Sequence, residues 1–93
     1  MTAYELIFPD YLDGYEHETE AKGYLVGVSV VVDGQPADFV VYDPVRLMQE
    51  VADAIESAGL FSEQRLLVVA RVTREEITSA IQKLSAGNFH DFL

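Results

Sequence analysis

Acidic and tyrosine side chains gather in the first quarter of the chain, and both kinds of residue are common where one protein binds another. Residues 1–21 contain six Asp or Glu residues and no Lys or Arg, and five of the ten aromatic residues lie within residues 1–24. Tyrosine is a frequent anchor at protein interfaces, and complementary charge speeds the encounter of two proteins. We therefore expect this segment to bind a basic protein partner through Tyr11, Asp13, Tyr15, Glu16 and Glu18.

Simpler interpretations of this segment stay open. Its acids can form a solvated loop, and its tyrosines can pack over the edge of the core. Together with His17 the acids also offer metal ligands, but they lack the regular alternation of ligands found in calcium-binding loops. We therefore predict no metal site.

Known catalytic patterns are missing from the sequence. The chain has no cysteine, which excludes a thiolate zinc site and a cysteine nucleophile. The histidines, His17 and His90, lie far apart, and no serine stands in an activating motif. The glycines form no phosphate-binding loop. We predict no catalytic residue and no cofactor, and we lean against an enzyme.

Two arginines suggest an alternative function. Arg46 falls in the first turn of an expected helix, where it can pair with Glu50 or with the acidic segment. It can instead join the free N–H groups of the helix start to hold a small anion. With Arg71 near the sheet edge, it would then mark the anion site of a small ligand-binding or enzymatic domain.

The overall charge restricts the class of partner. Sixteen acidic and six basic residues give a formal charge of −10. Nucleic acids and anionic membranes both attract basic surfaces, so we predict neither as a partner. Apolar runs are too short to cross a bilayer, and residues 1–10 do not have the pattern of a secretory signal, so we expect a cytoplasmic protein. The length of 93 residues fits one compact domain, 1–93.

The first half of the chain has the periodicity of strands. Residues 4–8 predict a short strand that Pro9 ends, and residues 9–22 an irregular acidic connection. Residues 23–32 alternate, with Val26, Val28 and Val30 on one face. The turn residues 33–36 then join them to a strand over 37–42, which predicts an antiparallel hairpin.

The second half alternates helix and strand. Asp43 as cap and Pro44 at the first position predict a helix over 44–58, which Gly59 ends. Residues 65–72 indicate an interior strand. Thr73 with Glu76 forms a capping box for a second amphipathic helix that ends at Gly87, followed by an apolar tail, 88–93.

The element order β-β-β-α-β-α predicts an α+β fold. We expect a two-layer sandwich with a mixed sheet of three to four strands and both helices on one face. The first helix connects strands 37–42 and 65–72, which should therefore pair in parallel. The expected core is Val26, Val28, Val30, Phe39, Val41, Leu47, Val51, Ile55, Leu66, Val68, Ile77 and Ile81.

The same alternation leaves apolar residues on the opposite sheet face. If the helices cover the core set, the outward set is Leu25, Val31, Val40, Leu67 and Val69. A monomer rarely exposes so large an apolar patch. Either the tail 88–93 covers it, or a second copy of the chain does, and we expect a homodimer. The sequence thus predicts a non-enzymatic interaction module, an inhibitor or adaptor of a basic protein.

Overall fold

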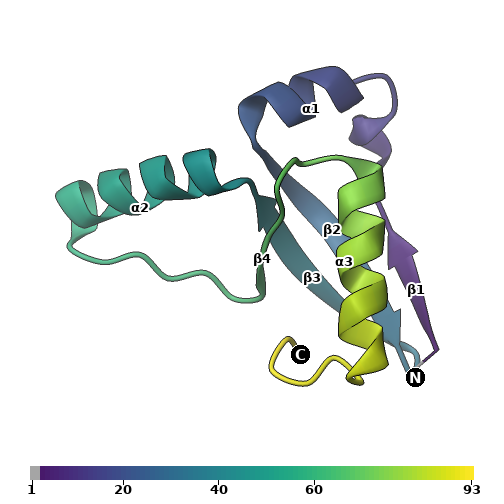
Figure 1. Cartoon of the computed structure of the whole chain (residues 1–93). Coiled ribbons are helices and arrows are strands. Elements are labelled where there is room, and N and C mark those ends of the chain that lie inside the picture. The colour runs from purple at the N-terminus through teal and green to yellow at the C-terminus, as the bar shows by residue number, and fades with distance from the viewer. Residues whose placement is uncertain (1–2) are drawn as a thin grey trace.

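A four-stranded mixed sheet is the centre of the computed structural model, which describes residues 3–93. The elements along the chain are β1 (Tyr4–Ile7), η1 (Asp10–Leu12), α1 (Glu16–Lys22), β2 (Tyr24–Val32), β3 (Gln35–Tyr42), α2 (Pro44–Ala58), β4 (Leu66–Val68) and α3 (Arg74–Ala86) (Figure 1). Strand order in the sheet follows the sequence, β1-β2-β3-β4. The α+β class and the mixed sheet are confirmed.

Pairing within the sheet agrees with the expected connections. β1–β2 and β2–β3 are antiparallel, and β3–β4 are parallel. The β2–β3 turn contains only two residues, Asp33 and Gly34, with φ of 53° and 76°. Two successive positive φ values belong to the tight turn that matches the twist of a hairpin, so the loop is shorter than the four residues expected.

A bulge interrupts the alternation of β2. The register with β3 shifts between Leu25 and Val28, and Gly27 has a φ of 85°. Because β2 spends three residues where β3 spends two, one extra residue lies between the paired positions, so Leu25 and Val28 face the same way, and both are buried. Val26 is 48% exposed, so its expected place in the core is wrong.

β4 is shorter than expected, and its faces are reversed. Parallel pairing places Leu67 beside Val41, which is fully buried. Leu67 packs on the core and Val69 is part of it, whereas Val68 is 43% exposed and Leu66 is only half-buried. The expected core positions Leu66 and Val68 are therefore wrong. The register of β4 against β3 decides which face of β4 meets the core. The alternation of residues along β4 does not by itself specify this register.

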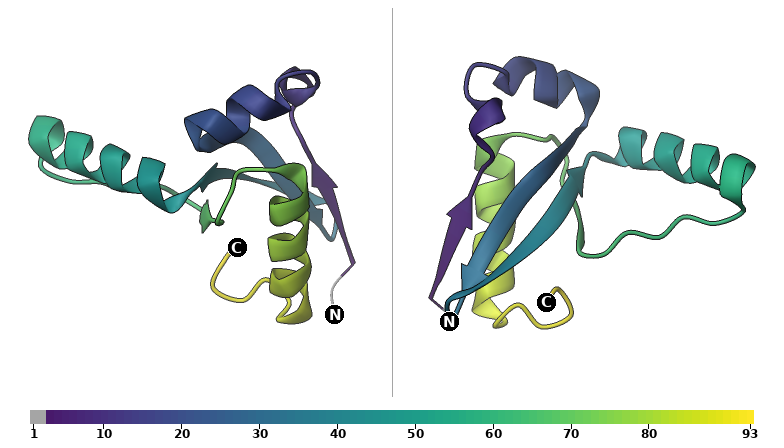
Figure 2. Two further views of the ribbon diagram at one scale, coloured as in Figure 1. Left: turned by 45° about the horizontal axis from the view of Figure 1, so that its top comes forward. Right: turned by 180° about the vertical axis from the view of Figure 1, so that it is seen from behind.

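Helix α3 and the C-terminal tail cover one face of the sheet (Figures 1 and 2). The buried core residues are Leu12, Leu25, Val28, Val30, Ala37, Phe39, Val41, Val69, Val72, Ile77, Ile81 and Phe89. Thr73 caps α3 by accepting the backbone N–H of Glu76 at 3.2 Å. In the tail, Phe92 makes an edge-on ring contact with Phe39. The tail thus extends the layer of α3 and does not cover the opposite face.

Helix α2 begins and ends as expected but does not lie on the sheet. Asp43 accepts the N–H of Arg46 at 2.7 Å, and Gly59 ends the helix with a φ of 79°. All three views show α2 projecting from the sheet as an arm, with residues 59–65 running back beside it (Figures 1 and 2). No residue of α2 is buried. Placing α2 on the sheet, with Leu47, Val51 and Ile55 in the core, is therefore wrong.

The connection over residues 9–22 is ordered, whereas an irregular loop was expected. It contains η1 and α1, and α1 ends at Gly23 with a φ of 79°. Within residues 3–93, no helix combines the length and the apolar character that crossing a bilayer requires.

The core assignment predicts different costs for two truncations. Ile81 is fully buried, so Ile81→Ala should lower the free energy of unfolding by about 2 to 5 kcal/mol. Val26 is exposed by the bulge, so Val26→Ala should change it by no more than about 0.5 kcal/mol. Urea unfolding measures both, and a large loss in Val26→Ala would contradict the bulge.

Capping of α2 predicts a local effect, because the helix stands apart from the core. Asp43→Ala should cost α2 about 1 kcal/mol of helix stability, whereas Asp43→Asn should retain the cap. Amide hydrogen exchange in α2 should speed up in Asp43→Ala, while exchange in α3 should not change. Equal exchange in the wild type and in Asp43→Ala would count against the cap.

Candidate protein-binding site

The expected binding segment is anchored at two buried points. Leu12 of η1 is 3% exposed and Thr19 of α1 is 7% exposed. The hydroxyl of Thr19 donates to the carbonyl oxygen of Tyr15 at 2.9 Å. These anchors direct the acids of the segment outward, because the remaining residues of α1 are exposed.

The bulge of β2 positions the start of the segment. A bulge leaves backbone groups outside the ladder, and the hydroxyl of Tyr11 donates to the carbonyl oxygen of Val26. A Cβ atom at Gly27 would lie 3.4 Å from Pro9 and 3.7 Å from the ring of Tyr11. These are ordinary van der Waals distances, so glycine serves here for its positive φ of 85°.

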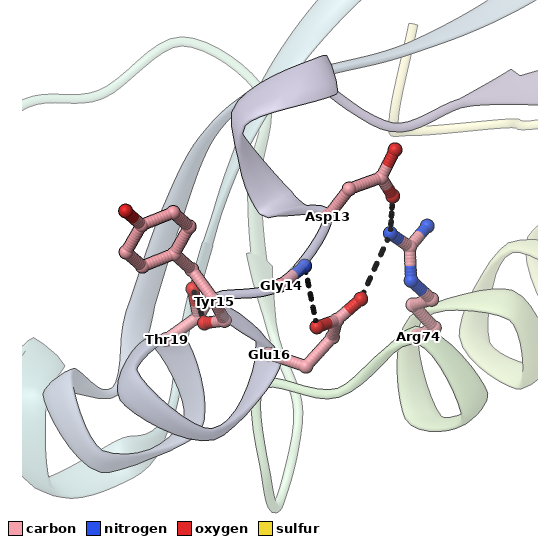
Figure 3. Close-up of polar contacts among 6 residues, drawn as sticks. All are labelled: Asp13, Gly14, Tyr15, Glu16, Thr19 and Arg74. Atoms are coloured by element: carbon pink, nitrogen blue, oxygen red, sulfur yellow. Dashed lines mark hydrogen bonds and ion pairs between the residues drawn. The ribbon is translucent and has the colours of Figure 1, made fainter.

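Arg74, at the start of α3, ties the segment to the body (Figure 3). Its guanidinium lies 2.6 Å from a carboxylate oxygen of Asp13 and 3.3 Å from one of Glu16. It also lies 5.0 Å from the ring centre of Phe8, a cation–π distance. Two of the five expected binding residues, Asp13 and Glu16, are thus engaged within the chain.

The local hydrogen bonds alter the acidity of Glu16. Its pKa is lowered from the ordinary 4.5, first by its own backbone N–H and then by Arg74 and the N–H of Gly14, against an opposing effect of desolvation. Gly14 N–H donates to Glu16 Oε1 at 3.0 Å. A lowered pKa means that ionised Glu16 stabilises the folded protein at pH values above the ordinary pKa of 4.5. This stabilisation is lost as the pH falls from there through the lowered pKa of the folded state.

A hollow with an apolar floor and an acidic rim lies between α1 and the start of α3. Its volume is about 340 Å³, and we call it the α1–α3 hollow. The floor consists of Leu12, Leu25, Val72 and Ile77, and the rim of Glu16, His17, Glu20, Thr73, Arg74 and Glu75. Three carboxylates therefore surround an apolar depression.

The other expected binding residues gather on a separate surface. Tyr11, Tyr15 and Glu18 line a smaller hollow of about 230 Å³ with Thr19 and Lys22, which we call the tyrosine hollow. Tyr11 and Tyr15 are 54% and 60% exposed. In Figure 3 the ring of Tyr15 points away from the Asp13–Glu16–Arg74 contact. The five expected residues thus divide between two surfaces of one segment.

The two arginines proposed for an anion site lie in different surroundings. Arg46, at the base of α2, pairs with Glu50 at 2.8 Å and stacks over the ring of Tyr24 at 4.5 Å. Arg71 lines a hollow with Glu20, Thr73, Glu75 and Glu76, where three carboxylates oppose an anion. The pairing of Arg46 with Glu50 is confirmed. None of the four hollows described within residues 3–93 is lined by both arginines.

The base of α2 is also held by a buried tyrosine. The hydroxyl of Tyr42 donates to Glu63 at 3.2 Å, which connects β3 to the segment that returns from the arm. Burial, and then the negative charge of Glu63, raises the pKa of Tyr42 to about 12. The base of the arm is therefore fixed by this contact, whereas no residue along α2 is buried against the sheet.

Most of the expected outward set is buried. Leu25, Leu67 and Val69 pack with α3, because the bulge and the parallel register reverse their faces. Val40 is 7% exposed, and only Val31 remains half-buried on the opposite face. These five residues do not form an exposed dimer face. Val26, Val68 and Ile7 are the exposed apolar residues of the strands instead.

Arg74, Glu20 and Glu75 are site residues that the sequence interpretation missed. Arg74 did give a signal, because a cation in the first turn opposes the helix dipole and so needs an acidic partner from outside the helix. Glu75 gave no such signal in the sequence. Nothing in the sequence could bring it near Glu20, 55 positions earlier, because that proximity depends on the packing of α1.

Comparison with known proteins gives no relative. No protein-family model, no curated protein and no solved structure matches the chain. Within residues 3–93, no three His, Asp or Glu side chains lie together in a way that could hold a metal ion.

The Arg74 contact predicts a change in a measurable pKa. Arg74→Met retains an apolar stem beside Phe8 but removes the charge, so the pKa of Glu16 should rise toward 4.5. Carboxyl carbon chemical shifts followed by NMR from pH 2 to 7 measure it, and Lys83→Met serves as a charge-matched control. An unchanged Glu16 pKa in Arg74→Met would mean that the backbone N–H groups alone are responsible.

Proposed function

We propose that this protein is a non-enzymatic interaction module that binds a basic partner protein through α1 and its surroundings. The observation that carries the proposal is the α1–α3 hollow, where an apolar floor is rimmed by Glu20 and Glu75, together with Glu16, which is paired with Arg74. Exposed tyrosines on the same segment supply the second element of a protein interface.

Lysine and arginine are the side chains that fit such a hollow. Their methylene stems favour apolar surface, while their charged ends remain beside water or an acid. A partner's cation could thus lie between Glu20 and Glu75 with its stem over Val72 and Ile77. Nucleic acid, with its uniform negative charge, would be repelled by the same rim.

The charge distribution favours fast association. Residues 1–22 hold six acids and one base, half of the net charge of the chain. Exposed ion pairs contribute only about 0 to 1 kcal/mol each, so steering is their main effect and the tyrosines would supply the anchoring contacts. An inhibitor or adaptor of a basic protein requires this combination.

A charge-reversal experiment tests the proposal. Wild-type protein is used to capture its partner from the native host, and binding of the purified partner is then measured with Glu20→Lys/Glu75→Lys. We expect a partner with a basic surface, an affinity at least about tenfold weaker in the double variant, and an association rate that falls with salt. The matched control is Glu5→Lys/Glu56→Lys, which makes the same change of charge at exposed positions outside the site.

Two results would contradict the proposal. One is a partner whose binding is equally weakened by the control variant, because only the net charge would then matter. The other is a partner with an acidic surface. An NMR titration with a lysine-rich peptide supplies an independent measurement, with shift changes expected in α1 and the first turn of α3 and absent from α2.

A further inference from the structure

Helix α2 exposes an apolar stripe that runs along one side of the arm, from its base towards its tip. Val45 is 69% exposed, Met48 73% and Ile55 54%, and Ala52 is exposed as well. Leu47, Val51 and Ala54, on the neighbouring side of the helix, are half-buried. The return segment thus shields one side of the helix and leaves the stripe Val45, Met48, Ala52 and Ile55 uncovered, which we call the α2 seam.

The spacing of the α2 seam is that of a helix that packs against another helix. Its four residues follow one another at intervals of three, four and three, as the core positions of a coiled coil do. On a helical projection Glu50 points directly away from the seam, Arg46 and Asp53 also point away, and Glu56 lies about 60° from the centre of the seam, at its flank. An uncharged seam lets a chain of charge −10 approach a like-charged copy of itself.

The surface area of the chain indicates a missing contact. The accessible surface is 6038 Å², roughly 600 Å² more than the value expected for a compact monomer of this mass. The radius of gyration is 13.7 Å, against about 12.3 Å for a compact domain of this length. Two such surpluses amount to about 1,200 Å², the lower bound of a stable interface.

We propose that the α2 seam pairs with the α2 seam of a second copy of this chain, antiparallel about a two-fold axis. This dimer is independent of the binding of a basic partner, because the α1–α3 hollow is lined by residues of the body, whereas α2, which carries the seam, projects from the body as an arm. Figure 1 shows α1 and α3 beside the sheet and α2 away from it. It also differs from a dimer through the sheet face.

The seam is complementary to itself in the antiparallel direction. With the axis level with Glu50, Val45 lies opposite the partner's Ile55 and Met48 opposite the partner's Ala52. A large side chain thus meets a small one at the centre, as interlocking helices require. Fifteen residues make α2 about 22 Å long, so the two bodies lie at opposite ends of the helix pair.

Measurement of mass tests whether the seam forms the dimer. Light scattering of the full chain at about 0.15 M salt should give twice 10.4 kDa, since screening is strong at this ionic strength. Met48→Lys and Ile55→Lys should each weaken the dimer at least tenfold, although each lowers the net negative charge. Ser57→Lys, on the polar side of α2, and Val26→Lys, on the free sheet face, should remain dimeric.

The absence of cysteine from the chain permits a second test, of orientation. A mixture of Val45→Cys and Ile55→Cys should form a cross-linked pair under mild oxidation. Neither variant alone should do so, because equivalent residues in an antiparallel pair lie about 15 Å apart along the axis, far beyond disulfide reach. Circular dichroism of each reduced variant confirms that it is folded.

Each outcome decides the proposal. A wild-type monomer at 100 μM would overturn it, as would a dimer lost in Val26→Lys and kept in Met48→Lys, which would assign the contact to the sheet. Cross-linking of Val45→Cys with itself would replace the antiparallel pair with a parallel one and overturn the proposed register. A dimer lost in both seam variants, together with cross-linking in the mixture alone, supports it.

Discussion

The β-bulge at Val26–Gly27 is the constraint on which the rest of the structure depends. By inserting an extra residue it turns Leu25 into the core beside Val28, and it releases the carbonyl of Val26 to accept the hydroxyl of Tyr11. That contact sets where η1 and α1 lie over the end of the sheet. The apolar floor and the acidic rim of the α1–α3 hollow come together only because α1 is held there.

Charge and apolar surface are divided between different parts of the molecule. The acids concentrate on the body around α1, where Arg74 neutralises only Asp13 and Glu16. On the arm, Val45 and Met48 are the two most exposed large apolar residues within residues 3–93, and the stripe that they form with Ala52 and Ile55 contains no charged residue. A surface of the first kind favours rapid encounter with a basic partner, and one of the second kind favours a close, dry contact between helices.

Local signals predicted the elements well and their faces less well. Asp43, Pro44 and Gly59 marked both ends of α2, because caps and terminal residues act within one turn of the backbone. The alternation through Gly27 failed, since a bulge shifts the faces by one residue and glycine alone does not say whether it does. Helix α1 was missed because its residues are almost all polar, so no apolar periodicity reveals it.

By itself the sequence determined the order of the four strands and the two long helices and the concentration of acids near the N-terminus, since these follow from residues close together in the chain. It also determined the parallel pairing of β3 with β4, because a single helix connects these strands. Only the tertiary structure decided which face of β4 meets the core, that Arg74 reaches Asp13, and that α2 stands away from the sheet. The amphipathic stripe of α2 requires an apolar surface to cover it but does not specify which one. That choice depends on the space left by α3 and the C-terminal tail, which occupy the sheet face that α2 was expected to share.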